Sequence, residues 1–491
     1  MTDSLRNPDL DPVPHEQRNW SAWNIAALWI GMAVCIPTYM LAAGMIKEGM
    51  SWWQAVLTVM LGNLIVLVPM ILNGHGGTKY GVPFPVLARA SFGTAGAQVP
   101  AIARALVACG WFGIQCWIGG AALYSILVAL NIVHEDVDTN QIALLGITGW
   151  QFACFLAFWA IHLIIVIRGI DSIRWLESFA APFLIACGLA LLVWAFIKVD
   201  DYHVLFDSKS KFEKPGEFWR VFFPQLTAMV GFWATLSLNI PDFTRYCKNQ
   251  RAQVLGQVLG LPPTMTLFCF ISIIVTGASV IVFGQAIWDP VQLVSKMGSP
   301  IVIVVSLFAL LVATLSTNLA ANVVSPANGF SNIAPSKISF RTGALITCFI
   351  GVAIMPWRLI NDFSAYIFTW LIGYSALLGP IAGIMICDYF ILRRTRLDTK
   401  ALYDKQGQYA GINWIAMLVL VLSIAPNLPG FINAATNTAG TENAIFPAFF
   451  DEIYVYAWFV GLLLSVVLYA VFMFGRAKPA PLEAFDTEIT K

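Results

Sequence analysis

Two side chains in an apolar stretch have the types and the spacing to bind a flat, hydrogen-bonding ring. Trp111 and Gln115 are four residues apart, so in a helix they lie on one face. An indole can stack on a planar ring, and an amide can bond to the N–H and C=O groups along the ring edge. The pair would equally suit helix packing with one interhelical hydrogen bond, so both interpretations stay open on these residues alone.

A second polar group lies within the apolar stretch 300–325. Ala313, Ser316 and Thr317 have the i, i+3, i+4 spacing of one helical face, which would present two hydroxyls. Hard cations prefer oxygen ligands, so this face could hold a metal ion. Asn322, further along, offers both a donor and an acceptor to a ligand. The alternative is that the hydroxyls bond to the preceding turn of their own helix.

Groups that could carry protons or catalyse a reaction are scarce in the apolar stretches. Asp242 and Asp388 fall near the ends of such stretches, and His162 lies deeper but stands alone, which favours a packing role. The sequence has no central carboxylate for proton coupling, and this favours a monovalent metal ion over a proton. It also has no Ser/His/Asp set, metal-ligand cluster or nucleotide-binding fingerprint, so an enzyme is not expected.

The composition indicates what kind of protein positions these side chains. Hydrophobic residues make up 58% of the 491 residues and Asp, Glu, Lys and Arg only 11%, compared with roughly half and a quarter in soluble domains. The mean hydropathy is +0.75. The 28 basic and 27 acidic residues nearly balance, so no nucleic-acid partner is expected. The chain is therefore predicted to be a polytopic membrane protein.

Apolar stretches of about 20 residues, long enough to cross a bilayer as helices, recur along the chain. The alternation typical of a β-barrel is missing, so we expect an all-α fold with about twelve transmembrane helices. The expected spans, of which the ninth and eleventh are short, are 22–46, 52–73, 100–131, 142–167, 177–197, 221–243, 256–283, 300–325, 342–357, 362–386, 412–428 and 454–475.

The distribution of Lys and Arg predicts the orientation in the membrane. With the N-terminus inside, most of the 28 basic residues fall in cytoplasmic segments, as the positive-inside rule requires. Residues 1–20 lack a secretory signal and are expected to form a cytoplasmic tail, and residues 476–491 a second one. We expect a multi-pass protein of the cell (inner or plasma) membrane with both termini in the cytoplasm.

Two spans interrupted by proline repeat a short pattern. Trp29 precedes Pro37 by the same distance as Trp233 precedes Pro241, and the offset between matched positions is 204. Five crossings separate the two segments, so they run through the bilayer in opposite directions. Such interrupted spans in inverted halves are typical of transporters that bind substrate at the repeat interface; a chance match is the alternative. The expected units are 21–198, 199–390, and 391–475 with a cytoplasmic loop and the last two helices.

Five longer segments resemble the nucleobase:cation symporter family, in its first branch of hydantoin, allantoin, cytosine and uracil permeases. They cover much of the chain from residue 20 to about 405 and comprise 73–93, 111–120, 239–246, 313–326 and 378–390. The resemblance implies the five-plus-five inverted-repeat fold of sodium-coupled amino-acid transporters, followed by two C-terminal helices.

Matched position by position, the resemblance also implies a set of binding residues. A planar heterocycle would lie between Trp111 and Trp233, with Gln115 and Asn322 bonded to its edge. A sodium ion would bind between the first and eighth spans. Its ligands would be three backbone carbonyls and two hydroxyls, those of Gly31, Val34, Ala313, Ser316 and Thr317.

Two positions beside the implied ring site depart from the family pattern. Many relatives carry Gln or Asn where this chain has Cys35, and a thiol is a weak donor and a weak acceptor. Phe232 replaces a small residue of some relatives and would narrow the pocket. The substrate preference of any one relative is therefore not assigned to this chain.

The sequence thus predicts a secondary active transporter that imports a nucleobase or related planar heterocycle, such as allantoin, hydantoin or uracil. Transport would occur by cation symport with Na⁺ through alternating access, with no cofactor besides the coupling ion. The expected partners are the heterocycle and the lipid bilayer; the oligomeric state stays open, and a monomer would suffice. Two alternatives remain, a proton-coupled symporter of cytosine- or purine-type nucleobases and a membrane sensor that binds such compounds without transport.

Overall fold

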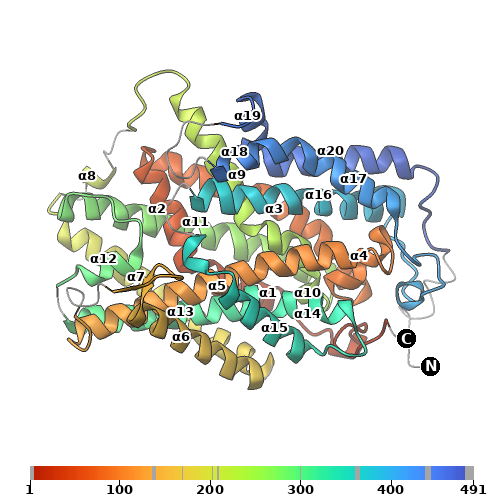
Figure 1. The fold of residues 1–491 in the computed structure, drawn as a ribbon, viewed down its shortest axis with the longest axis horizontal. Coiled ribbons are helices and arrows are strands. Elements are labelled where there is room, and N and C mark those ends of the chain that lie inside the picture. Colours follow the sequence, from red (N-terminus) through yellow and green to blue (C-terminus); the bar gives the residue numbers. More distant parts are fainter. Residues whose placement is uncertain are drawn as a thin grey trace.

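The computed structural model describes residues 5–134, 140–168, 170–201, 203–206, 210–298, 300–359, 365–436 and 444–481. The expected tails lie partly outside these ranges, in the first four residues and beyond residue 481. Within the described residues the chain forms a bundle of long helices that run roughly side by side along the long axis of the molecule (Figure 1).

Eight helical segments of the described residues are long and apolar enough to cross a membrane. Five are single helices: α3 (Trp52–Tyr80), α5 (Gln98–Ala129), α6 (Gly149–Arg168), α9 (Glu217–Asn239) and α11 (Gln250–Phe283). Three are composite: α13 (Pro300–Asn322) with α14 (Val324–Ile333); η3 (Ala365–Leu371), α16 (Ile372–Ile386) and η4 (Cys387–Leu392); and α17 (Trp414–Ile424), η6 (Ala425–Asn427) and α18 (Leu428–Thr436).

Four further segments complete the set of expected spans. Two are bent pairs, α1 (Ala22–Ala33) with α2 (Ile36–Lys47), at 60°, and α19 (Phe449–Val455) with α20 (Ala457–Met473), at 83°. Two are shorter apolar helices, the part Ile185–Lys198 of α7 (Ile170–Lys198) and α15 (Phe340–Ala353). Each of the twelve expected spans overlaps one of these segments, so the helical architecture predicted from hydropathy is confirmed.

Short elements connect the spans. They are η1 (His15–Gln17), α4 (Phe84–Phe92), the hairpin strands β1 (Gln141–Ile142) and β2 (Ile147–Thr148), α8 (His203–Phe206), α10 (Pro241–Thr244), α12 (Pro290–Ser295), η2 (Pro356–Arg358) and η5 (Ala401–Tyr403).

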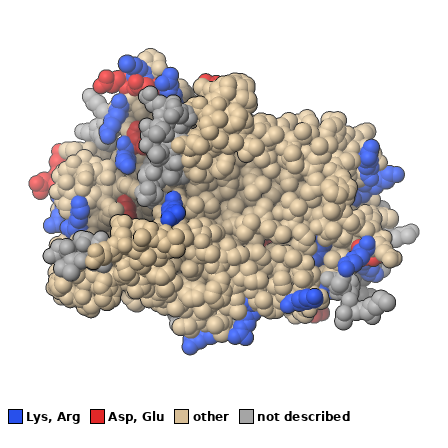
Figure 2. All heavy atoms as spheres, in the orientation of Figure 1, with Lys and Arg blue, Asp and Glu red and all other residues tan. Residues whose placement is uncertain are grey.

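The surface of the bundle matches a membrane environment. Figure 2 shows most Lys, Arg, Asp and Glu side chains towards the two ends of the long axis, with a broad uncharged zone between them. Large apolar side chains on the helices are exposed, among them Val68, Val305 and Leu463, each more than half exposed. An exposed apolar zone around a helical bundle is what contact with lipid requires, so the chain is a polytopic membrane protein.

The two proline-containing spans differ where the sequence predicts their breaks. The first breaks between Ala33 and Ile36, and Pro37 lies in the first turn of α2, where its missing N–H leaves no helical hydrogen bond unmade. In the sixth, α9 continues through Asn239, and Ile240, which keeps helical dihedral angles, leads directly into α10, which Pro241 begins. Proline therefore lies in the first turn of a helix in both halves, but only the first span is unwound in front of it.

The repeated tryptophans meet inside the bundle. The rings of Trp29 in α1 and Trp233 in α9 lie 5.1 Å apart at 89°, an edge-to-face contact. Both side chains are almost completely buried. Positions related by the offset of 204 therefore lie side by side, as expected for two halves related by an approximate two-fold axis.

Both described ends of the chain lie at the same end of the bundle. Arg89 of α4 donates from Nη1 to the carbonyls of Leu5, at 3.3 Å, and Leu402, at 3.0 Å. Near the other terminus, the backbone N–H of Ala480 donates to the carbonyl of Arg396, in the same connection that contains Leu402. The two terminal segments therefore lie on one side of the bundle.

Candidate functional site

A small cavity lies beside the break between α1 and α2. It brings together all six residues for which the sequence predicts contact with a ring, namely Cys35, Trp111, Gln115, Phe232, Trp233 and Asn322. The remaining lining residues are Met32, Thr235, Leu236, Thr317 and Ala321, so every lining residue is uncharged. The volume is about 20 Å³, room for about one water molecule. A heterocycle would therefore fit only after side chains have moved.

Aromatic rings form one wall of this cavity. Phe232 contacts both indoles, with its ring centre 5.3 Å from that of Trp111 and 4.9 Å from that of Trp233, edge to face in each case. Trp111 donates from Nε1 to the hydroxyl of Tyr374 at 3.3 Å, and Tyr374 donates to the carbonyl of Gly231 at 2.9 Å. The Trp111 indole is therefore held in one orientation by α9 and α16.

The tenth span supplies aromatic partners that the sequence reasoning missed. Tyr366, Trp370 and Tyr374 all lie within 6.4 Å of the Trp111 ring, measured between ring centres. Gly110 permits this approach, because a Cβ at that position would collide with the Trp370 ring. The spacing of four residues between these three aromatics predicts one helical face, and this was the signal that could have identified them.

Several polar atoms at the cavity carry no hydrogen bond from the described residues. Oε1 of Gln115 and Nε1 of Trp233 are buried and without a partner. Asn322 donates from Nδ2 to Oδ1 of Asn318 at 3.0 Å. Because buried polar groups are normally paired, these orphaned atoms mark a place where a polar ligand would supply the missing bonds.

The first and eighth spans meet where the sequence places a cation. The Thr317 hydroxyl donates to the carbonyl of Gly31 at 3.1 Å, directly joining α13 to α1. Oγ of Ser316 is buried and has no partner among the described residues. Two hydroxyls and a carbonyl are ligands that Na⁺ accepts, and the orphaned Ser316 oxygen fits that role.

The other two predicted cation ligands are in contact as well. Val34, directly at the break, and Ala313 share one small apolar cluster, against which Phe268 packs. The cluster holds the interrupted backbone of the first span against α13. All five predicted ligands therefore come from two segments that touch.

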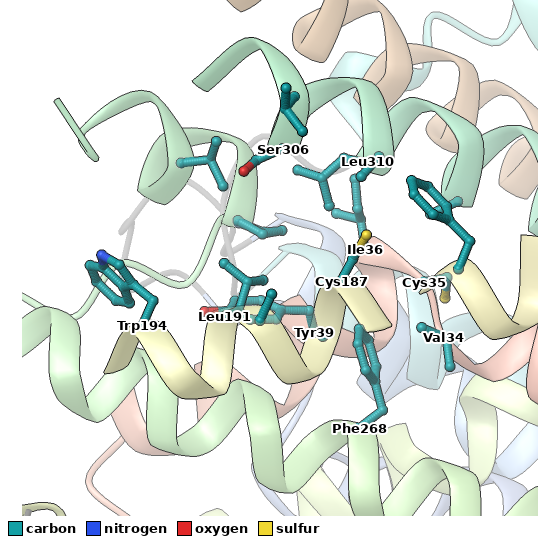
Figure 3. Close-up of a pocket in the computed structure, with 18 of the residues that line it drawn as sticks. Val34, Cys35, Ile36, Tyr39, Cys187, Leu191, Trp194, Phe268, Ser306 and Leu310 are labelled. Carbon is teal, nitrogen blue, oxygen red and sulfur yellow. The ribbon is translucent and has the colours of Figure 1, made fainter. Parts of the chain in front are cut away.

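Cys35 lies between the small cavity and a much larger one. Its Sγ is 3.2 Å from Oγ1 of Thr38, and its side chain lines both cavities. The larger cavity has a volume of about 270 Å³ and is lined by α2, α7, α11, α12 and α13 (Figure 3). Its lining is almost entirely apolar, with Ser306 and Tyr39 among the few polar side chains.

Arg104 lies next to the small cavity on α5. Its Nε donates to the Thr235 carbonyl at 3.2 Å and to Oδ1 of Asn239 at 2.7 Å, and its Nη2 donates to the Ala321 carbonyl at 3.3 Å. Thr235 and Ala321 both line the cavity. The guanidinium thus ties α9 and α13 together at one edge of the cavity.

His162 has the packing role that the sequence favours, since it is buried against Phe112 and Phe158, but it also has a polar neighbour on another helix. Its Nε2 lies 3.0 Å from Nδ2 of Asn318, the residue that accepts a hydrogen bond from Asn322. The histidine is therefore connected to the cavity through two amides. The sequence could not show this because the connection depends on how α6 packs against α13.

The sequence of this chain is similar to those of known transport proteins. A family described as permeases for cytosine/purines, uracil, thiamine and allantoin matches residues 12–461. The purine-uracil permease NCS1 of Arabidopsis thaliana is 41% identical over 96% of this chain and 78% of its own length. The allantoin permease of Bacillus subtilis is 38% identical over 99% of this chain and 96% of its own.

Solved structures agree with these matches. Mhp1, a nucleobase-cation-symport-1 family transporter in a closed conformation with bromovinylhydantoin bound, superposes with a TM-score of 0.76 and 27% identity. The superposition covers 96% of this chain and 95% of that chain. A Na⁺-coupled sialic acid symporter shares the fold alone, with a TM-score of 0.61 and 11% identity.

Proposed function

Since the chain belongs to the family of permeases for cytosine/purines, uracil, thiamine and allantoin, we propose that it imports a nucleobase or related planar heterocycle. Allantoin, hydantoin and uracil are the proposed substrates, and Na⁺ is the proposed coupling ion. The chain is a transporter and not an enzyme. Relatives named allantoin and uracil permeases support this substrate class.

One observation carries the proposal: the cavity in which two indoles, two amides and the broken first span converge. The heterocycle would stack between Trp111 and Trp233, and Phe232, which now touches both indoles, would have to turn away or lie at the ring edge. Gln115 and Asn322 would hydrogen-bond to the polar edge of the heterocycle. The thiol of Cys35 contributes only a weak polar contact.

The proposed cation site adjoins the ring site through Thr317, which lines the cavity and bonds to the Gly31 carbonyl. Na⁺ would be held by the hydroxyls of Ser316 and Thr317 and by the carbonyls of Gly31, Val34 and Ala313. A site made only of neutral ligands binds weakly, so sodium dependence in the millimolar range is expected. Bound Na⁺ would fix α1 against α13 and so favour one conformation of the bundle.

We propose alternating access as the transport mechanism, because an interrupted span beside the binding site is typical of transporters that work in this way. We propose that the heterocycle enters from outside and leaves to the cytoplasm, with both termini on the cytoplasmic side. The location of both described ends on one side of the bundle supports an even number of crossings. Reaction of single cysteines introduced near each terminus with an impermeant maleimide in whole cells would test this orientation.

Uptake into proteoliposomes tests the proposed function directly. Labelled uracil, allantoin and hydantoin would be offered under three conditions: an inward Na⁺ gradient, choline replacing Na⁺ at equal pH on both sides, and choline with an inward proton gradient. We expect accumulation of at least one compound above its outside concentration only with the Na⁺ gradient. Equal accumulation in choline driven by a pH gradient would instead establish a proton-coupled carrier, and binding without accumulation would establish a sensor.

A further inference from the structure

A buried histidine lies behind the cavity on α6. This helix buries a single narrow stripe, made of Cys154, Phe155, Phe158, His162 and Val166. The stripe faces the neighbouring helices, and His162 is its one polar side chain apart from the Cys154 thiol. His162 is completely buried, and its ring packs edge to face on Phe112 and Phe158.

A chain of hydrogen bonds runs from this histidine to the cavity. Nδ1 of His162 lies 3.0 Å from the carbonyl of Phe158, and Nε2 lies 3.0 Å from Nδ2 of Asn318. Nδ2 of Asn318 also donates to the carbonyl of Phe112 at 3.2 Å. Oδ1 of Asn318 accepts from Nδ2 of Asn322, which lines the cavity.

Two backbone carbonyls determine the direction of every bond in this chain. A carbonyl can only accept, so the Phe158 oxygen requires a proton on Nδ1 of His162, and Nε2 is then a bare acceptor. The Phe112 oxygen likewise requires that the amide nitrogen of Asn318, and not its oxygen, points towards it. The opposite direction would place two acceptors against each other at both carbonyls. Asn322 must therefore use its nitrogen for Asn318.

The consequence appears at the cavity wall. With Nδ2 of Asn322 bound to Asn318, its Oδ1 accepts no hydrogen bond from any described residue and is the group left for a ligand. We infer that His162 is a positioning residue that fixes Asn322 as a hydrogen-bond acceptor for a ring N–H of the transported heterocycle. The inference rests on the proposed function for the identity of the ligand, but the direction of the chain does not depend on it.

Uracil and cytosine distinguish the two possible orientations of Asn322. Uracil has an N–H between its two carbonyls, whereas cytosine has a bare acceptor nitrogen at the same ring position. When the fixed acceptor of Asn322 faces this ring position, it favours uracil, because cytosine would place two acceptors against each other there. We expect purified wild-type protein to bind uracil at least about 30-fold more tightly than cytosine, as for one lost hydrogen bond with an unpaired buried oxygen.

Variants of His162 test whether the histidine causes this preference. His162→Leu removes the acceptor for Asn318, and the uracil-to-cytosine ratio is expected to fall about 10-fold. His162→Gln can donate to the Phe158 carbonyl and accept from Asn318, so it is expected to restore the ratio. Phe155→Leu is the matched control, because Phe155 is buried on the same stripe and its ring packs on Trp117 and Trp357.

A measurement on the wild-type protein covers the case in which His162→Leu does not fold. NMR of protein with ¹⁵N-labelled histidine distinguishes a protonated from a bare ring nitrogen, and His162→Gln identifies the signal among the five histidines. We expect His162 with its proton on Nδ1. A proton on Nε2 would overturn the inference, as would a wild-type protein without preference for uracil or an unchanged ratio in folded His162→Leu. A wild-type protein that binds no heterocycle would contradict the proposed function instead. The NMR measurement of the His162 ring nitrogens would then still test the direction of the hydrogen bonds.

Discussion

The two cavities that share Cys35 differ in size and in chemistry: the larger one is apolar, and the smaller one contains the polar side chains. The large one, of about 270 Å³, has room for a small ligand but offers almost only apolar side chains. The small one, of about 20 Å³, contains two indoles, two amides and the Thr317 hydroxyl. A polar heterocycle placed in the large cavity would lose its hydrogen bonds with water and gain few in return. Volume in one conformation is therefore a poorer guide to the site than the lining residues.

The largest expected effect is that of Trp111→Ala in the small cavity. Stacking of a base on an aromatic ring contributes about 1–3 kcal/mol, so the affinity for the heterocycle is expected to fall about 100-fold. Equilibrium binding of labelled uracil, allantoin and hydantoin to purified protein measures this. Trp414→Ala, which changes an exposed tryptophan, is the control. Unchanged affinity in Trp111→Ala would contradict the proposal that the heterocycle stacks on this indole.

A smaller loss is expected for Gln115→Leu. A polar group of the ligand left without a partner costs about 1–3 kcal/mol, so uptake at low substrate concentration is expected to fall about 20-fold. The same substitution at Gln225 is the matched control, because Gln225 is also buried on a spanning helix but does not line the cavity. Equal losses in both variants would show a general packing defect and not a lost ligand contact.

Ser316→Ala tests the cation site independently of the heterocycle site. Loss of one hydroxyl ligand is expected to raise the Na⁺ concentration for half-maximal uptake about 10-fold, as for one charge-assisted contact, and to leave the maximal rate nearly unchanged. Ser306→Ala is the control on the same helix α13, since Ser306 lines the large cavity and not the small one (Figure 3). A shift of the same size in Ser306→Ala would contradict the assignment of the cation to the Ser316 hydroxyl.

The smallest effect is expected from filling the large cavity. Ala309 lines it together with Leu191 and Leu310. Ala309→Leu adds apolar volume where space exists, so the affinity for the heterocycle is expected to change less than about 3-fold. A loss comparable to that of Trp111→Ala, in a protein of normal thermal stability, would mean that the large cavity contributes to ligand binding.

Features that depend on local sequence could be predicted without the structure. Pro37 and Pro241 predicted two helix breaks; the first span is broken at Val34 and Cys35, whereas α9 passes into α10 through a helical Ile240. The i, i+4 spacing of Trp111 and Gln115 predicted that they share one face, and both line the cavity. In these cases the physical cause, a missing backbone N–H or the pitch of a helix, acts within a few residues.

Features that depend on the packing of distant helices could not be predicted in the same way. His162 stood alone in the sequence because its partner Asn318 is on another helix, 156 positions away. The aromatic wall of Tyr366, Trp370 and Tyr374 was missed because its spacing shows a shared face but not which residue the face meets. The set of cation ligands came from the family resemblance, since most of them are backbone carbonyls that any residue type provides.

The coupling of the heterocycle to Na⁺ tests the central claim most directly, because Thr317 both lines the ring cavity and bonds to Gly31. The measurement is the dissociation constant of the heterocycle with purified protein in Na⁺ and in choline, for wild type and for the isosteric Thr317→Val. We expect Na⁺ to tighten binding about 10-fold in wild type, within the usual range of coupling between two sites, and to have little effect in Thr317→Val. Equal affinity in Na⁺ and choline for the wild-type protein would contradict the account.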